Sequence, residues 1–306
     1  MLNQPLVSIV MTTYNGQSFL EEQLESILAQ EHSHFELIIC DDCSTDGTVA
    51  ILESYSNKDK RITVYRNISN LGVNRNFEQG LLKATGELIA FADQDDVWRP
   101  DKLSEQLRLF VAEEIVLVHS ASSVFSKTIN EEKKLATVSH PMTGNDTRRL
   151  LLRNSISGHN MMFRKKLRDY IVPVPDSLYY DWWISITATC IGEIAATNKI
   201  LAYQRSHGKN ITVQERKTKK QTLAEFNERK KALEAFITIR QMNPGYVTFA
   251  KRLYLHLLSL NNRRFSISYF IFLLRNAEVL FFYKKAGIPF LAHLKTAYRM
   301  SFTVDV

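Results

Sequence analysis

The first hundred residues alternate short apolar, β-branched runs with amphipathic helical patterns. The apolar runs have the length of buried strands, and an apolar stripe with helical spacing follows each of the first three. A strand–helix–strand order of this kind predicts a mostly parallel sheet with helices on both faces and right-handed crossovers, which is a Rossmann-like α/β fold. The predicted strands cover residues 6–12, 35–40, 62–65 and 88–92, and the predicted helices start near Ser18, Asp46 and Asn74.

Two regions follow this alternating part. Residues 113–212 are mixed α/β, with strand-like runs at 115–119 and 160–163 and a helix starting near Asp181. Beyond that the pattern is helical, over about 221–241, 246–260, 266–284 and 288–300. We therefore expect an α/β domain over residues 1–212, with halves at about 1–112 and 113–212, and a helical C-terminal region over residues 213–306.

The cysteines do not point to a disulfide scaffold. Hydrophobic residues make up 45% of the chain, enough for a packed core, and three cysteines suit a reducing compartment. Cys40 and Cys43 have Cys-x-x-Cys spacing, but the intervening Asp41 and Asp42 disfavour a thiolate. Neither a redox centre nor a zinc site is expected there.

Charge is distributed unevenly along the chain. The net charge is +7, and the stretch from Arg205 to Val306 carries 19 Lys and Arg against 6 Asp and Glu. Such a basic region suits an anionic partner: lipid headgroups, a phosphorylated acceptor or nucleic acid. No signal peptide is evident, and the most apolar stretch, residues 265–274, is shorter than the roughly 20 residues of a membrane span. We therefore expect a cytoplasmic protein that lies on the inner face of the cell membrane.

Polar clusters follow three of the predicted strands. They are residues 12–15, 41–44 and 93–96. In open α/β sheets, ligands bind beyond the carboxyl ends of the strands, so these clusters mark a binding edge.

The acidic cluster is the most informative of the three. Asp93 and Asp95 stand two residues apart in an extended segment, so their carboxylates can point the same way and share one hard cation. Mg²⁺ or Mn²⁺ held by two carboxylates keeps coordination positions for diphosphate oxygens. The alternative is that these acids cap the helix that starts near Pro100. Asp41 and Asp42 either recognise a base and ribose or form an ordinary turn.

Three ordered motifs together resemble family 2 glycosyltransferases of the GT-A fold. The likeness covers about residues 5–210, and the Asp-Gln-Asp-Asp-Val-Trp version is similar to rhamnosyltransferase-like members that build bacterial surface polysaccharides. The motifs are Val7-Ser8-Ile9-Val10-Met11-Thr12-Thr13-Tyr14-Asn15, Ile38-Ile39-Cys40-Asp41-Asp42-Cys43-Ser44-Thr45-Asp46-Gly47-Thr48 and Ala92-Asp93-Gln94-Asp95-Asp96-Val97-Trp98.

The resemblance implies roles on the donor side. Nucleotide-sugar contacts are expected from the residues at the strand ends and from Arg75, in the stretch from Asn70 to Asn76. The metal is expected to be held by Asp95 and Asp93, with His207 as a late imidazole ligand. The expected nucleotide-sugar set is Thr12, Tyr14, Asn15, Asp41, Asp42, Arg75, Asp93 and Gln94.

The resemblance also implies a catalytic base at the start of a later helix. Asp181 fits this position, and the following Trp182 and Trp183 would stack on acceptor sugar. His159 would hydrogen-bond the acceptor or the donor sugar. The alternative is a helix-capping Asp followed by two core tryptophans.

These motifs predict an inverting, metal-dependent glycosyltransferase. It would move a sugar from dTDP-rhamnose or a UDP-sugar to a hydroxyl of a surface polysaccharide or a lipid-linked oligosaccharide. The alternative is a nucleotide-sugar-binding regulatory protein without catalysis. The basic helices would lie on an anionic membrane, pack on the catalytic domain or form a homodimer contact. No Gly-x-Gly-x-x-Gly, P-loop or nucleic-acid-binding module is present, so we expect no nucleic-acid partner.

Overall fold

The computed structural model describes residues 4–125, 129, 140–206, 219–260, 265–284 and 289–302. The strands are β1 (Val7–Thr13), β2 (Phe35–Asp41), β3 (Ile62–Arg66), β4 (Leu88–Ala92), β5 (Val97–Trp98), β6 (Ile115–Phe125), β7 (Met161–Arg164) and β8 (Glu193–Arg205). The helices are α1 (Leu20–Leu28), α2 (Thr48–Lys58), α3 (Val73–Lys83), α4 (Lys102–Leu107), α5 (Arg168–Ile171), α6 (Tyr180–Ile191), α7 (Lys219–Phe236), α8 (Pro244–Ser259), α9 (Ile267–Arg275), α10 (Ala277–Leu280) and α11 (Pro289–Met300).

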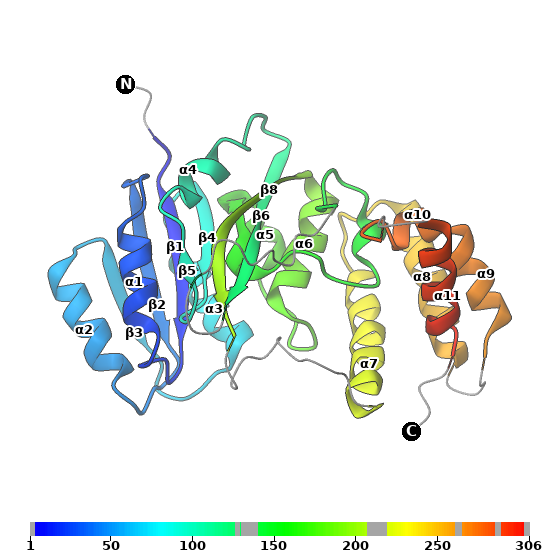
Figure 1. The fold of residues 1–306 in the computed structure, drawn as a ribbon, viewed down its shortest axis with the longest axis horizontal. Helices are drawn as coiled ribbons and strands as arrows, with labels where there is room; N and C mark the ends of the chain where they lie inside the picture. Colours follow the sequence, from blue (N-terminus) through cyan, green and yellow to red (C-terminus); the bar gives the residue numbers. More distant parts are fainter. Residues whose placement is uncertain are drawn as a thin grey trace.

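The strands form one sheet in the order β3-β2-β1-β4-β7-β6-β8-β5 (Figure 1). The neighbours among β1 to β4 pair in parallel, as the alternation of strands and helices predicted. Strand β7 then runs antiparallel to both β4 and β6, and β6 pairs in parallel with β8. The carboxyl ends of β1, β2, β3 and β4 therefore lie at the same edge.

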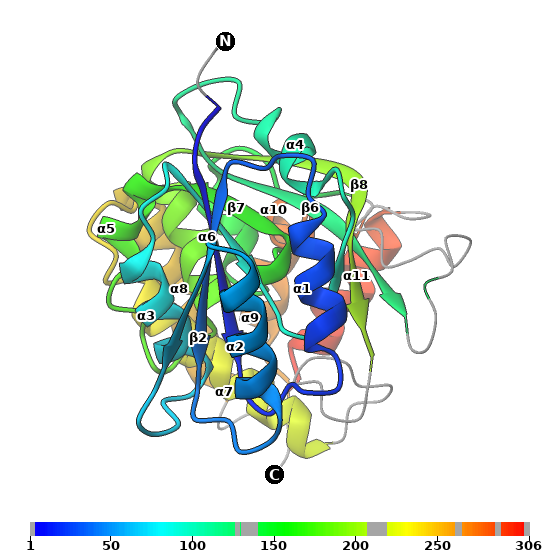
Figure 2. The same ribbon diagram turned by 90° about the vertical axis from the view of Figure 1, so that its left-hand side faces the viewer.

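Helices cover both faces of the sheet, which confirms the predicted layering (Figure 2). Alternate residues of one strand enter different cores, because successive side chains of a strand point to opposite faces. Ile9 and Met11 pack with α1, α2 and α4, whereas Val10 packs with α3 and α6. Both cores consist of fully buried aliphatic and aromatic side chains.

Two local predictions were wrong. Ser18 and Glu21 have the spacing of a capping box, which predicts reciprocal cap bonds at the start of the first helix. The box does not form, because α1 starts at Leu20 with Phe19 as its N-cap and without a side-chain cap bond. The long helix predicted over residues 266–284 is divided at Asn276, where the backbone leaves helical geometry at φ −115°. Periodicity alone does not show such a break, since the apolar spacing continues across it.

The C-terminal helices gather at one end of the molecule, with α7 between them and the sheet (Figure 1). Their buried residues belong to the same hydrophobic cluster as α3 and α6; for example, the Trp182 and Phe236 rings lie edge to face, 5.4 Å apart. Among the described residues, none of the helices combines the length and the hydropathy required to cross a bilayer.

Candidate active site

The loop after β1 and the loop after β4 are joined by the side chain of Gln94. The main-chain N–H of Tyr14 donates to Gln94 Oε1 at 2.9 Å, and Gln94 Nε2 donates to the Tyr14 carbonyl at 3.2 Å. A side-chain amide that pairs with one residue's main chain in both directions fixes two loops against each other. Gln94 therefore positions the donor-side loops, and its predicted contact with the nucleotide sugar stays a prediction.

The loop after β2 is ordered by buried polar side chains. Asp41 is fully buried and accepts from Thr13 Oγ1 at 2.9 Å and from the Ser44 N–H at 2.9 Å. Asn15, with φ of +49°, accepts from the Thr45 N–H at 2.9 Å through its side-chain oxygen. Asn tolerates this left-handed conformation better than most residues. Asp41 and Asn15 thus stabilise the turn after β2, in agreement with the alternative that Asp41 belongs to an ordinary turn.

Asp42 holds the loop between β3 and α3 against the carboxyl-end edge of the sheet. Its buried carboxylate accepts from Asn67 Nδ2 at 2.8 Å, from the Leu71 N–H at 2.8 Å and from the Gly72 N–H at 2.9 Å. An ionised carboxylate offers about four lone-pair sites, so three of them are used inside the protein. The predicted contact of Asp42 with the base stays a prediction.

The side chains of Tyr14 and Thr12 are more open than these acids. The Tyr14 ring is 48% exposed at the end of β1, and Thr12 is half-buried. A partly exposed ring at a strand end can stack on a base, as predicted for Tyr14.

The acidic loop after β4 meets a histidine from a distant part of the chain. His159 Nδ1 lies 3.4 Å from Asp93 Oδ2 and 3.6 Å from Asp96 Oδ2. His159 and Asp96 are buried, whereas the Asp93 side chain is 37% exposed. The three residues form a cluster of ligand atoms in which only Asp93 is partly exposed.

The charges in this cluster depend on one another. Burial, together with the negative charges of Asp93 and Asp95, raises the pKa of the Asp96 carboxyl to about 7, against the opposing effect of His159. Burial alone would lower the pKa of His159, but the carboxylates of Asp96 and Asp93 outweigh that effect and raise it. The cluster therefore stabilises positive charge at its centre.

Two cations lie next to the loop. Lys102 is fully buried, donates to the His159 carbonyl at 3.1 Å and lies 4.7 Å from the Trp98 ring centre. Burial lowers the pKa of this ammonium to about 7, against the opposing charge of Asp96. Arg205 Nε donates to the Asp95 carbonyl at 3.1 Å, and its other end pairs with Glu22. Lys102 therefore holds the main chain of His159, and Arg205 holds the main chain of the acidic loop.

The residues of this cluster fit a divalent cation. One ligand atom each from Asp93, Asp96 and His159 lie within 4.8 Å of one another, a spacing that one ion can bridge. Asp96 Oδ2, the carboxylate oxygen that lies nearest His159 Nδ1, is buried and has no hydrogen-bond partner among the described residues. A buried carboxylate oxygen without a partner is costly, and an ion bound beside it would satisfy it. The imidazole suits Mn²⁺ better than Mg²⁺.

This cluster differs from the predicted metal set. Asp93 is common to both, but the structure adds Asp96 and His159. Asp95 is half-buried outside the cluster, and His207 lies outside the described residues. The predicted roles of Asp95 and His207 stay predictions.

Asp181 lies in the first turn of α6, half-buried, as the predicted helix start required. Its pKa is raised to about 6, chiefly by burial and also by the negative charge of Asp93, although hydrogen bonds from the Trp182 N–H and the Asn154 side chain oppose the shift. Asp181 and Asp93 are therefore within electrostatic reach. A carboxyl with this pKa is ionised near neutral pH and can accept a proton.

The two tryptophans after Asp181 are core residues. Trp183 Nε1 donates to the Ile171 carbonyl at 2.9 Å, and Trp182 Nε1 donates to the Leu150 carbonyl at 2.8 Å. Both side chains are 8% exposed. Trp182 still borders a cavity, so the prediction that it contacts the acceptor keeps a structural basis, and the predicted acceptor contact of Trp183 stays a prediction.

Arg75, in the first turn of α3, is not among the residues of the acidic cluster. Its guanidinium forms ion pairs with Asp176 at 2.8 Å and with Glu78 at 3.2 Å. Arg75, which we predicted to contact the diphosphate, is thus paired with two carboxylates of the protein. Its contact with the diphosphate stays a prediction.

The sequence provided no role for Asp96 or Lys102. Asp96 stood in the quoted acidic motif, but only Asp93 and Asp95 have the alternate spacing that indicates a shared ligand. His159 was assigned to substrate sugar and not to the cation. Lys102 follows a helix-start proline, and no periodic or motif signal distinguishes a fully buried lysine from a surface one.

The sequence is similar to those of known glycosyltransferases. Residues 8–171 match the model of glycosyl transferase family 2. The chain is 35% identical over 155 residues to TuaG of Bacillus subtilis, a glycosyltransferase assigned by name to teichuronic acid biosynthesis, with 51% of this chain and 60% of that protein covered. It is 36% identical over 138 residues to an uncharacterised Haemophilus influenzae glycosyltransferase, covering 45% and 55% of the two chains. The aligned parts are thus below two thirds of these relatives' lengths.

Solved structures show the same fold. S. aureus TarS (residues 1–349), in complex with UDP-GlcNAc, superposes with a TM-score of 0.62 at 17% identity, covering 95% of this chain and 79% of that one. A mannosyltransferase from Pyrobaculum calidifontis, in complex with GDP-Man and Mn²⁺, superposes with a TM-score of 0.56 at 16% identity, covering 98% and 88%. The architecture is therefore GT-A, as the sequence motifs implied.

Proposed function

Because the chain belongs to glycosyl transferase family 2, we propose that it transfers a sugar from a nucleoside diphosphate sugar to a hydroxyl of a bacterial surface polysaccharide or a lipid-linked oligosaccharide. One observation supports this most directly. The acidic cluster of Asp93, Asp96 and His159 lies within electrostatic reach of Asp181, the carboxylate proposed as base. Diphosphate binding and proton removal can then occur side by side.

A divalent cation would be held by Asp93, Asp96 and His159. When bound, it would neutralise the negative charge that develops on the leaving diphosphate. The exposed face of Asp93 allows donor oxygens to reach it. Lys102 and Arg205 hold the main chain of His159 and Asp95, so the ligand geometry is set before the donor arrives.

Asp181 supplies the base for direct displacement with inversion. Its carboxylate takes the proton of the acceptor hydroxyl while the acceptor oxygen bonds to the donor C1 and the bond from C1 to the diphosphate oxygen breaks. The proton stays on Asp181, and the nucleoside diphosphate leaves with the bonding electron pair. No covalent intermediate is required. The presence of Asp93, Asp95 and Asp181 favours this enzyme over a regulatory protein that binds nucleotide sugar without catalysis.

The nucleotide can be identified by thermal shift with a panel of nucleoside diphosphate sugars and Mg²⁺ or Mn²⁺. We expect dTDP-rhamnose or a UDP-sugar to raise the melting temperature in the presence of metal, because binding to the folded state stabilises it. Donor at 100 times its Kd should raise the free energy of unfolding by about 2.7 kcal/mol. Hydrolysis or transfer of the same donor then distinguishes an enzyme from a regulatory protein.

GDP-sugars and free sugars serve as controls in that panel. Stabilisation by no nucleoside diphosphate sugar, with or without metal, would contradict the proposed function. Stabilisation without any turnover would favour the regulatory alternative.

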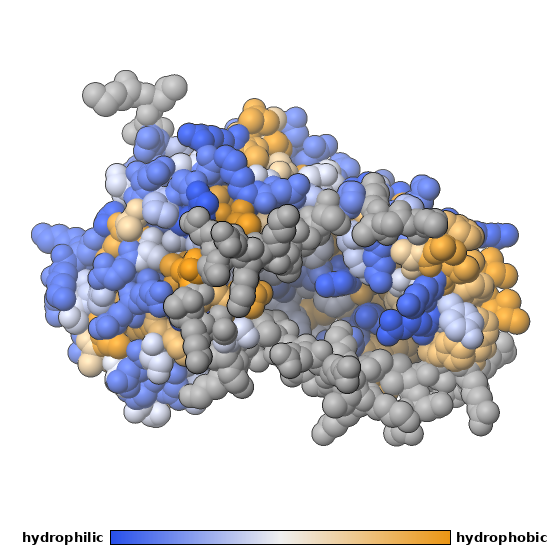
Figure 3. Space-filling model, in the orientation of Figure 1, coloured by the Kyte–Doolittle hydropathy of each residue, from blue (hydrophilic) through white to orange (hydrophobic). Residues whose placement is uncertain are grey.

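The C-terminal helices carry exposed apolar side chains beside basic ones, which supports our proposal that they lie on an anionic membrane. Figure 3 shows hydrophobic residues gathered over this end of the molecule. Basic side chains on α8 and α11 accompany them and suit acidic lipid headgroups. The most exposed apolar residues are Leu255 (63%), Ile267 (68%), Phe290 (66%) and Leu291 (54%), and the basic ones are Lys251, Arg252, Lys295 and Arg299.

Vesicle co-sedimentation tests this surface. We expect the protein to bind vesicles containing phosphatidylglycerol, and the double substitution Phe290→Glu and Leu291→Glu to weaken binding at least about tenfold, because two apolar side chains no longer enter the lipid. Leu82→Glu on α3 is the control, since Leu82 is also exposed (55%) but lies outside the C-terminal helices. Equal binding by both variants would contradict the membrane proposal, and a wild-type mass twice that of the double variant would indicate a homodimer contact instead.

A further inference from the structure

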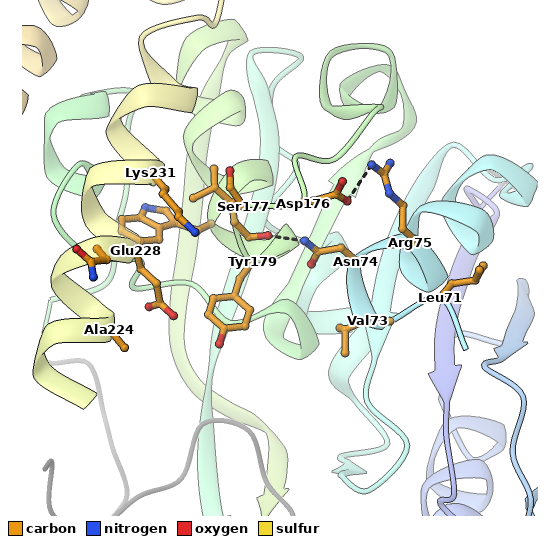
Figure 4. Close-up of a pocket in the computed structure, with 14 residues that line it drawn as sticks. Leu71, Val73, Asn74, Arg75, Asp176, Ser177, Tyr179, Ala224, Glu228 and Lys231 are labelled. Atoms are coloured by element: carbon orange, nitrogen blue, oxygen red, sulfur yellow. Dashed lines mark hydrogen bonds and ion pairs between the residues drawn. The ribbon is translucent and has the colours of Figure 1, made fainter. Parts of the chain in front are cut away.

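A cavity of about 600 Å³ lies between the α/β part of the chain and α7 (Figure 4). Its walls come from the start of α3, from the segment before α6 and from one side of α7. The volume falls within the roughly 300–1,000 Å³ of small-molecule sites. The α7 wall lies beyond residues 8–171, so a part of this chain outside the family match completes the cavity.

The charges that line the cavity balance one another. Arg75 and Lys231 face Asp176 and Glu228, and the ion pair of Arg75 with Asp176 is 2.8 Å long. A site for phosphate or a polyanion would present an excess of cations. The lining therefore suits a neutral ligand.

The remaining groups are those that recognise hydroxyl-rich rings. Tyr179 is 48% exposed and presents a ring and a phenol, and Ser177 offers a hydroxyl group (Figure 4). Asn227 adds a side-chain amide to the lining. Glu228 accepts and Lys231 donates, so both halves of a sugar hydroxyl find partners. An apolar ring edged by donors and acceptors is the composition expected of a saccharide site.

The cavity lies next to the proposed base. Burial raises the pKa of the Tyr179 phenol, and the carboxylates of Glu228 and Asp181 add to that effect. Tyr179 and Trp182 both line the cavity and flank Asp181 at the start of α6, so the cavity lies beside the proposed base. Asn74 ties the two other walls together, since its side chain donates to the Pro175 carbonyl at 3.3 Å and to the Leu178 carbonyl.

We propose that this cavity binds a neutral sugar unit of the acceptor, adjacent to the hydroxyl that is glycosylated at Asp181. The proposal rests on the proposed transferase function, and α7 supplies the specificity-determining side chains Asn227, Glu228 and Lys231.

Saturation-transfer NMR tests the site without knowledge of the natural acceptor. The probes are maltose, cellobiose and N,N′-diacetylchitobiose at millimolar concentration, with glucuronic acid and glucose 1-phosphate as anionic comparators. We expect saturable binding of at least one neutral disaccharide, and Asn227→Ala and Lys231→Ala should each weaken it by about tenfold, the loss of one or two hydrogen bonds.

Lys230→Ala is the matched control. Lys230 precedes Lys231 on α7 but lies 4.7 Å from the Phe226 ring, outside the cavity lining. It removes the same charge from the same helix and should change binding by no more than about twofold.

Thermal shift with donor and metal on the same proteins separates the two proposals. Normal donor stabilisation without binding of any neutral disaccharide would overturn the acceptor site and leave the transferase function standing. Preferential binding of the anionic probes would overturn the neutral class. Displacement of the disaccharide by UDP alone would place the cavity in the donor site and overturn the inference. Absence of donor stabilisation and turnover would instead contradict the transferase function.

Discussion

Asp181→Asn is expected to lower sugar transfer by about 10²–10⁴-fold, the contribution of a general base, while donor binding stays nearly unchanged. The amide keeps the size of the side chain but cannot take the acceptor proton. Steady-state transfer and donor thermal shift together give both quantities. The wild-type rate should also fall as pH drops through about 6, because Asp181 must be ionised to act and its raised pKa is about 6.

Asp169→Asn is the matched control for this substitution. Asp169 is an exposed carboxylate on α5, so its loss should leave transfer within about twofold of wild type. Transfer by Asp181→Asn near the wild-type rate, or a pH profile unchanged by the substitution, would remove Asp181 from the role of base.

Removal of the divalent cation is the second large effect. We expect chelation to abolish transfer and added Mn²⁺ or Mg²⁺ to restore it, because charge on the leaving diphosphate would lose its neutralising partner. Asp93→Asn should lower transfer by about 10²–10³-fold at fixed metal concentration, equivalent to several kcal/mol of transition-state stabilisation.

The comparison of Asp95→Asn with Asp96→Asn decides which carboxylate completes the site. The geometry of the cluster predicts the larger loss for Asp96, whereas the spacing in the sequence predicts it for Asp95. Glu87→Gln is the control, because Glu87 is exposed and immediately precedes β4, at the opposite end from the acidic loop. Full activity in excess chelator would exclude the cation.

The strand-end motifs predicted where the site lies because parallel strands bring their carboxyl ends to one edge. Tyr14, Asp42 and Asp93 follow different strands, and Gln94 and Asp42 tie their loops together as neighbours. Local spacing could not predict that His159 would approach Asp96, because the two residues meet only when β7 pairs with β4 and β6.

The sequence also could not show how many of these polar side chains hydrogen-bond within the protein. Asp42 and Gln94 are residue types that can bind nucleotides, yet in this protein both form hydrogen bonds to neighbouring loops. Trp183 follows Asp181 closely, as expected of an indole that stacks on the acceptor. Its ring is nevertheless buried, and its N–H donates to the Ile171 carbonyl. Residue type predicts the chemistry available, whereas packing decides which side chains are left for a ligand.

The shared hydrophobic cluster of α6 and the C-terminal helices has a consequence for dissecting the protein. Trp182 and Phe236 pack together in it, one beside the proposed base and the other at the end of α7. A fragment trimmed to the family match at residue 171 would lose α6 itself, and one trimmed just after β8 would leave the Trp182 side of α6 facing water. The end of the family match is therefore not a point at which the polypeptide can be cut while α6 keeps the helices that pack against it.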